Sequence, residues 1–286
     1  MSKKAAILDS DFTIKTALTK NSKGESLADI VLKLPYTFYC HEQNKKELSA
    51  HQNTALIWLK DKIDSNIIDC LSDFDILSII QNSYSISRNN AIRLYADRLK
   101  LACEIFSATF YEKHYSYLEE LKNKIEPISD DEFISAINTG DSSVGRGNNL
   151  GEIKDILLSI VLNQCSNIDC IFFCSDDNRA RRNILAFTVS SEFTFKSISY
   201  MGFYWVAKNK KLLTRDEEIE FLSGWKHFCQ PSLKDSDLKV TIKEHISRKQ
   251  PDYPKENIDD LFSAIWDDKV VMLDDGYLVY KYELKQ

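Results

Sequence analysis

The feature that most constrains the fold is the segment 151–182, in which a helical pattern passes into the wholly apolar run CIFFC at 170–174. A strand without polar residues is typical of a parallel sheet that is covered on both faces. The runs AAILD at 5–9 and YTFYC at 36–40 predict two further strands, with helical segments between them. Strands that alternate with helices in this way predict an α/β fold with a parallel sheet.

A helical region, a loop and a hairpin are expected around this sheet. From about 51 to 138 the pattern is almost wholly helical, and one buried helix face is indicated by Tyr95, Leu99, Ala102, Phe106 and Phe110. The glycine-rich segment 139–151 lacks the third glycine of a nucleotide loop and has no strand before it, which favours a hinge or lid. A strand is expected at 186–191, and the last residues predict a hairpin that turns at 275–276.

Composition excludes several classes of protein. The net charge of −6 argues against a binder that depends on broad phosphate neutralisation. No apolar run approaches the roughly 20 residues of a membrane helix, and the first residues carry no signal-peptide pattern, so we expect no membrane and a cytoplasmic location. The seven cysteines show no CxxC pair and the five histidines no HxH or HExxH spacing, which disfavours zinc and a disulfide framework.

Acidic residues follow the predicted strands at the points where these end. Asp9 closes the first strand, and Asp176 and Asp177 follow Ser175 after the CIFFC strand. Asp11 lies two residues beyond Asp9. The carboxyl ends of parallel strands meet at one edge of the sheet, where ligands bind in such folds. Each acid also has a structural interpretation: Asp9 as a turn cap, Asp11 as an N-cap, and the pair as part of a solvated turn.

The helix that begins at Gly151 adds two more acids near this edge. Glu152 lies in its first turn, where the helix dipole favours an acid, and Asp155 follows one turn later on nearly the same face. Glu42 and Glu47 follow the second strand, and either could reach the same crevice. Carboxylates gathered at one point must bind a cation or take up protons, so the sequence indicates a divalent-metal site.

Three arginines follow the last acidic pair. Arg179, Arg181 and Arg182 could contact phosphates, and pairing with Asp176 or Asp177 is an equal alternative. The lysines at 208, 210 and 211 are more typical of solvated surface.

These motifs resemble those of PIN-domain nucleases. LDSDFTI is similar to the first motif, KKEL at 45–48 to the second, LGEIKDILLSIVL to the third, and CIFFCSDDNRARRNILAF to the fourth. The resemblance implies that Asp9, Glu47, Glu152 and Asp176 form the catalytic acidic quartet, that Asp9, Glu152, Asp155, Asp176 and Asp177 hold Mg²⁺ or Mn²⁺, and that Asp11, Glu42 and Ser175 are accessory. The chain differs from the small members of the family in having about 100 residues between the second and third motifs.

The resemblance implies a three-layer α/β fold and metal-dependent endonuclease cleavage of nucleic acid, with RNA favoured over DNA, in a toxin or defence protein. It divides the chain into a PIN-like domain at 1–50 and 148–230, a helical insertion with the glycine-rich loop at 51–147, and a C-terminal extension with a hairpin at 231–286. The insertion could dock a protein inhibitor or partner or a second copy of the chain. The alternative is a non-catalytic interaction protein that retains the fold.

Overall fold

The computed structural model describes residues 3–51, 53–145, 149–166, 168, 170–177, 180–182, 195–229, 239–241 and 255–281. Its strands are β1 (Lys4–Leu8), β2 (Thr37–His41), β3 (Ile68–Leu71), β4 (Cys170–Cys174), β5 (Phe195–Ile198), β6 (Lys239–Thr241), β7 (Lys255–Asn257), β8 (Val270–Met272) and β9 (Leu278–Tyr280). Its helices are α1 (Ser10–Leu18), α2 (Leu27–Val31), α3 (Glu42–His51), α4 (Asn53–Asp64), α5 (Asp73–Tyr84), α6 (Arg88–Glu104), α7 (Phe110–His114), α8 (Ser116–Lys122), α9 (Asp130–Ser143), α10 (Leu150–Ser166), α12 (Tyr200–Lys210), α13 (Arg215–Cys229) and α14 (Ile258–Trp266).

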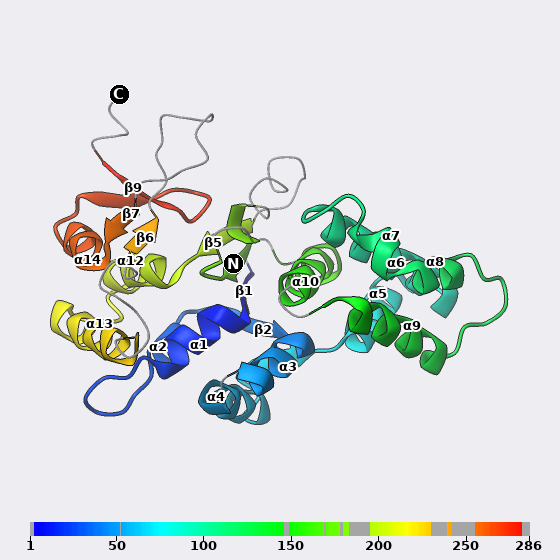
Figure 1. Ribbon diagram of the computed structural model, residues 1–286, viewed down its shortest axis with the longest axis horizontal. Coiled ribbons are helices and arrows are strands. Elements are labelled where there is room, and N and C mark those ends of the chain that lie inside the picture. Colours follow the sequence, from blue (N-terminus) through cyan, green and yellow to red (C-terminus); the bar gives the residue numbers. More distant parts are fainter. Residues whose placement is uncertain are drawn as a thin grey trace.

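A parallel sheet in the order β3-β2-β1-β4-β5 lies at the centre of the molecule. Side chains of a strand alternate between its two faces, so each strand feeds two cores. Ala6 and Leu8 of β1 belong to the first core, with α1, α2, α4 and α12 to α14, whereas Ala5 and Ile7 belong to the second core, with α5 to α10. The two groups of helices lie on opposite sides of the sheet (Figure 1). The predicted α/β fold with a central parallel sheet is confirmed, and it has three layers.

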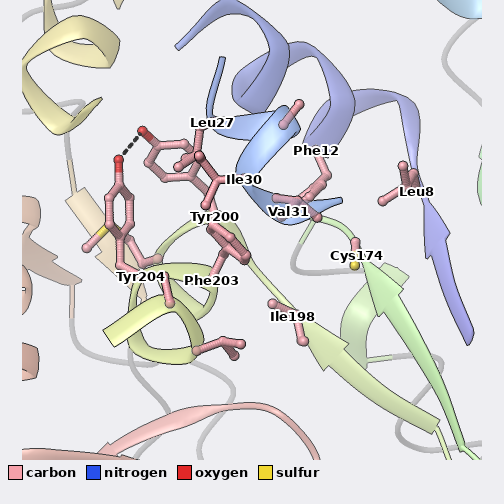
Figure 2. Close-up of a cluster of buried hydrophobic side chains, with 14 of the residues drawn as sticks. Leu8, Phe12, Leu27, Ile30, Val31, Cys174, Ile198, Tyr200, Phe203 and Tyr204 are labelled. Atoms are coloured by element: carbon pink, nitrogen blue, oxygen red, sulfur yellow. Dashed lines mark hydrogen bonds between the residues drawn. The ribbon is translucent and has the colours of Figure 1, made fainter. Parts of the chain in front are cut away.

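The first core joins the start of the chain to its later helices. Phe12 of α1 and Ile30 of α2 pack with Ile198 of β5 and Tyr200 of α12, all of them nearly inaccessible to solvent (Figure 2). The hydroxyls of Tyr200 and Tyr204 lie 2.8 Å apart, so each buried phenol has a hydrogen-bonding partner. This packing holds β5 and α12 against α1, which begins directly after β1.

The second core surrounds α10, which is buried on nearly every side from Gly151 to Leu162. A helix that is apolar all round belongs in the interior of a protein. Lys154 and Asp155 interrupt this apolar surface although both are fully buried. Buried charges are costly unless they are paired, so these two positions need partners.

Several helices begin with a capping residue. Ser26 caps α2, Ser129 and Glu132 form a capping box before α9, and Thr214 with Glu217 does the same before α13. The C-terminal hairpin of β8 and β9 turns through Gly276, which has a φ of +87°. The buried face predicted around Tyr95 is present on α6, which ends at Glu104. Phe106 and Phe110 lie after the end of this helix and pack against the same core.

Other predictions need correction. The region 51–138 is not wholly helical, because residues 68–71 form β3, the edge strand beside β2. Part of the predicted insertion thus belongs to the central sheet, and the division into domains stays a prediction. The loop expected at 139–151 is shorter, because α9 continues to Ser143. The strand expected at 186–191 lies outside the described residues. In the part of the chain that the structure describes, no helix is long and apolar enough to cross a membrane.

Candidate functional site

The carboxyl ends of β1, β4 and β5 are tied together at one edge of the sheet. The backbone N–H of Asp9 donates to the carbonyl of Cys174 at 3.1 Å, and that of Ser175 donates to Ile198 at 3.1 Å. After β1 the chain continues toward β2, whereas after β4 it continues toward β5 on the other side of β1. This reversal is the place where α/β sheets open a binding crevice.

Asp9 lies at the centre of this edge and is 2% exposed. It occupies the N-cap position of α1, but its side chain makes no capping hydrogen bond and instead accepts one from the Ser175 hydroxyl at 2.7 Å. The interpretation of Asp9 as a cap is therefore wrong. Burial raises the pKa of Asp9 well above its usual range, and the charge of Glu152 raises it further. A side chain held in this way takes up a proton unless a cation is near.

The two acids of α10 face the same place. Burial raises the pKa of Glu152 to about 7, with repulsion from Glu47 adding to the effect and the backbone N–H of Glu152 opposing it. Burial also raises the pKa of Asp155 well above its usual range, and the charge of Asp9 contributes next. Asn44 donates through Nδ2 to both carboxylate oxygens of Asp155, at 3.3 and 3.2 Å, and to the carbonyl of Leu8 at 2.7 Å.

Glu47 is the glutamate after the second strand that joins this group. Its carboxylate accepts a hydrogen bond from the Ser10 hydroxyl at 2.7 Å, and its charge raises the pKa values of Asp9 and Glu152. A Cβ at Gly151 would lie 2.6 Å from Glu47 Oε1, so the glycine allows the carboxylate to lie against the start of α10. The charge of Glu42 instead acts on Cys70 of β3, whose pKa it tends to raise. We call Asp9, Glu47, Glu152 and Asp155 the acidic cluster.

Both acids after β4, Asp176 and Asp177, already accept hydrogen bonds from other parts of the protein. Asp176 accepts hydrogen bonds from Lys15 Nζ at 2.8 Å and from the backbone N–H of Tyr200 at 2.6 Å. Lys15 also pairs with Asp11 at 3.0 Å, and these two carboxylates outweigh burial, so the pKa of Lys15 is raised. Asp11 lies in the first turn of α1 rather than at its N-cap, so the N-cap interpretation is wrong. Asp177 caps the next turn by accepting from the backbone N–H of Ala180 at 2.7 Å.

The arginines differ from one another in placement. Arg181 is 4% exposed, donates through Nε to Ser197 at 2.7 Å and lies 4.3 Å above the ring of Tyr277. The structure therefore packs Arg181 under the C-terminal hairpin, and the predicted phosphate contact would require this packing to open. Arg182 is exposed, and Arg179 lies outside the described residues. Lys208 binds the end of α14 through the carbonyls of residues 265 and 266.

A pocket of about 520 Å³ opens beside the acidic cluster. Ser10, Glu47, Glu152 and Asp177 line its acidic side. Residues 141, 142, 144 and 145, at the end of α9 and directly after it, also line the pocket. A ligand of nucleotide size would fit this volume, because ligand pockets run from about 300 to 1,000 Å³.

A buried ionic network that includes Asp141 of the pocket lining joins the helices of the second core. Lys154 Nζ lies 2.9 Å from Asp73 and 3.0 Å from Asp141, and its side chain is fully buried. Tyr95 donates to Asp73, and Tyr115 donates to Asp141 at 2.7 Å. The network therefore fixes α10, which carries Glu152 and Asp155, to α5 and α9.

His41 joins this network at the end of β2. Its Nδ1 accepts a hydrogen bond from the backbone N–H of Gln43 at 3.0 Å, and its Nε2 lies 3.4 Å from Asp73. Sequence patterns did not identify Ser10, Lys15, Asn44 or Lys154 as parts of the site. The spacing of four between Asp11 and Lys15 could have indicated that pair.

The acidic cluster fits a hard divalent cation in its chemistry. Its donors are carboxylate oxygens, and burial followed by mutual repulsion raises the pKa values of Asp9, Glu152 and Asp155. Asn44 Oδ1, on the amide that binds Asp155, is buried without a hydrogen-bond partner among the described residues. In their present placement, however, no three Asp, Glu, His or Cys side chains of the described ranges form a ready set of metal ligands.

Comparisons of the chain with protein-family models, with curated proteins and with solved structures found no match. The likeness to PIN-domain nucleases therefore depends on the sequence motifs and on the placement of their residues.

Proposed function

We propose that the chain is a PIN-like endonuclease that uses Mg²⁺ or Mn²⁺ to hydrolyse phosphodiester bonds, with RNA as its preferred substrate. The observation that carries this proposal is the convergence of Asp9, Glu47, Glu152 and Asp155. They come from three distant parts of the sequence and lie together at the carboxyl ends of β1 and β4. Burial and neighbouring charges raise the pKa values of Asp9, Glu152 and Asp155, and such a group of acids destabilises a fold, which is more readily understood if the acids serve a ligand.

In this proposal the acidic cluster would hold the cation, and Asp177 lies at the pocket beside it. A bound divalent cation lowers the pKa of water and neutralises phosphate charge. The chain itself orients the carboxylates: Ser175 fixes Asp9, Ser10 fixes Glu47, and Asn44 fixes Asp155. Proton release from Glu152 is required for it to bind a cation, and with a pKa of about 7 this occurs near neutral pH.

Asp176 has a different part in this proposal from the one that the motif implies. Its two oxygens bind Lys15 and the first backbone N–H of α12, so it fixes the loop after β4 rather than joining the acidic cluster. The ion pair of Lys15 with Asp176 links α1 to that loop, and Asp177 follows directly. Asp176 is thus proposed as a positioning residue for Asp177.

The test is cleavage of labelled RNA and single-stranded DNA pools in Mn²⁺, with an EDTA control. We expect the wild type to cut RNA, Asp9→Asn to be inactive although folded, and Glu120→Gln, a matched change on α8, to be fully active. The Asn side chain keeps the shape of Asp9 and can still accept a hydrogen bond from Ser175. Equal cleavage by wild type and Asp9→Asn would refute the proposal, as would cleavage that survives EDTA.

A second candidate is a non-catalytic interaction protein that retains the fold. The engagement of Asp176 by Lys15 and the absence of a ready ligand set among the described residues favour it. Two exposed apolar side chains, Tyr117 of α8 at 56% and Ile125 of the segment between α8 and α9 at 88%, offer a contact surface. No heat of Mn²⁺ binding by calorimetry, together with no cleavage, would support this candidate over the nuclease.

A further inference from the structure

Two cysteines that are far apart in the sequence face each other on the central sheet. Cys40 of β2 and Cys70 of β3 are direct partners in the parallel register. Both pack against the first core, so their side chains project from the same face of the sheet. Neighbouring strands lie about 4.8 Å apart. That separation falls within the about 4.4 to 6.8 Å between Cα atoms that a disulfide spans.

The surroundings make the two thiols unequal. Cys40 is fully buried, whereas Cys70 is partly exposed on the edge strand. The two thiols interact with each other, and this interaction lowers the pKa of Cys70 and raises that of Cys40. Lys45 of α3 also lowers the pKa of Cys70, while burial and Glu42 oppose this. The thiolate is the reactive form of cysteine, so Cys70 is the accessible nucleophile and Cys40 the thiol behind it.

We propose that Cys40 and Cys70 form an oxidisable dithiol, in which Cys70 reacts first with a small-molecule disulfide and Cys40 resolves the product. The Cys70 thiolate attacks one sulfur of the reagent, the reagent's S–S bond breaks, and a mixed disulfide forms as the first thiolate leaves. Cys40 then loses its proton and attacks the Cys70 sulfur, which releases the second thiolate. The two protons of the protein thiols end on the two released thiols, and one S–S bond is made for the one broken.

The disulfide would connect the edge strand β3 to β2 and would close a loop that contains α3 and α4. Helix α3 carries Asn44 and Glu47, so oxidation would restrain the element that brings these side chains to the acidic cluster. This inference does not depend on the nuclease proposal, because it concerns the chemistry of the two thiols.

The experiment uses the intact wild-type chain with oxidised glutathione, followed by alkylation and non-reducing peptide mapping. We expect a cross-linked peptide pair that contains Cys40 and Cys70, and in Cys40→Ser a glutathione that remains on Cys70. Cys165 is the internal control, because it is also partly exposed but burial raises its pKa. In pulse alkylation at neutral pH, we expect Cys70 to react at least about tenfold faster than Cys165.

Equal alkylation rates at Cys70 and Cys165 would overturn the proposal. So would glutathione that stays on Cys70 in the wild type without a link to Cys40. The cross-link between Cys40 and Cys70 is sought in the wild type, so this result stands even if Cys40→Ser fails to fold.

Discussion

Lys154→Met is the substitution from which the structure predicts the largest loss of stability. It removes the one cation that, among the described residues, lies within 4 Å of both Asp73 and Asp141, and so breaks two ion pairs of the second core. Breaking a buried ion pair from one side costs about 3 to 5 kcal/mol. At about 2 °C per kcal/mol for a chain of this size, the melting temperature should fall by about 6 to 10 °C.

The pH dependence of this loss follows from Asp73. Burial alone would raise the pKa of Asp73, but the charge of Lys154, together with His41 and the hydrogen bond from Tyr95, outweighs it and holds the pKa well below its usual range. The ion pair therefore stabilises the wild type above the unfolded pKa of about 4, and this is lost only as the pH falls through the lower folded pKa. Without Lys154, Asp73 can take up a proton, so the cost should be full at pH 7 and smaller at pH 4.

The assay is thermal and urea unfolding at pH 7 and pH 4. Lys100→Met is the matched control, because Lys100 makes a partly exposed ion pair at 3.7 Å with Glu112, which should contribute about 0 to 1 kcal/mol, and a contact at 5.7 Å with the ring of Tyr111. Removing the two carboxylates as well, with Asp73→Asn and Asp141→Asn, should recover much of the loss. A Lys154→Met variant as stable as Lys100→Met at pH 7 would refute the reasoning.

Three more predictions concern the site and its surroundings. Glu152→Gln should stabilise the protein at pH 8 by up to about 3 kcal/mol. The pKa of Glu152 is about 7 in the folded state and 4.5 in the unfolded state, so the stability of the wild type falls as the pH rises between these two values. A profile of melting temperature against pH that is the same for the variant and the wild type would contradict this. Gly276→Ala should destabilise by about 2 kcal/mol or more, because its Cβ would lie 1.9 Å from a backbone oxygen of β5, whereas Gly24→Ala, also at positive φ but with open space, should cost less in thermal unfolding. Glu47→Gln should lower RNA cleavage by at least about tenfold and Glu42→Gln should not, since only Glu47 faces the acidic cluster; the reverse order in the cleavage assay would reject this assignment.

The parts of the fold that could be predicted are those with strong local patterns. The strand at 170–174 is apolar throughout, which is typical of a strand inside a sheet. The acids that follow it are then expected at the carboxyl edge of that sheet. Glu152 and Asp155 share a helix face by spacing alone. The edge strand β3 was missed because its four residues, IDCL, include an exposed Asp69 and show no strong alternation.

The missing parts of the site depend on contacts between distant segments. Lys154 resembles a surface lysine in the sequence, and only the packing of α5 and α9 around α10 shows that it is buried between carboxylates. Asp176 has the motif of a metal ligand, but Lys15 of α1 reaches it across 161 positions. Cys40 and Cys70 become neighbours only through the register of β2 and β3. Local patterns carry no information on such pairings.

The hydrogen bond between Ser175 and Asp9 joins residues 166 positions apart. A ribosome that has made the first half of the chain has produced β1, β2 and β3, but not the strand β4 that completes the crevice. Chains that are cut short or still being synthesised therefore hold Asp9 without Ser175, Glu152 or Asp155. The acidic cluster and Ser175 can therefore come together only after residue 175 of the 286 has been made, and under the proposed nuclease function this delay would protect the RNA being translated.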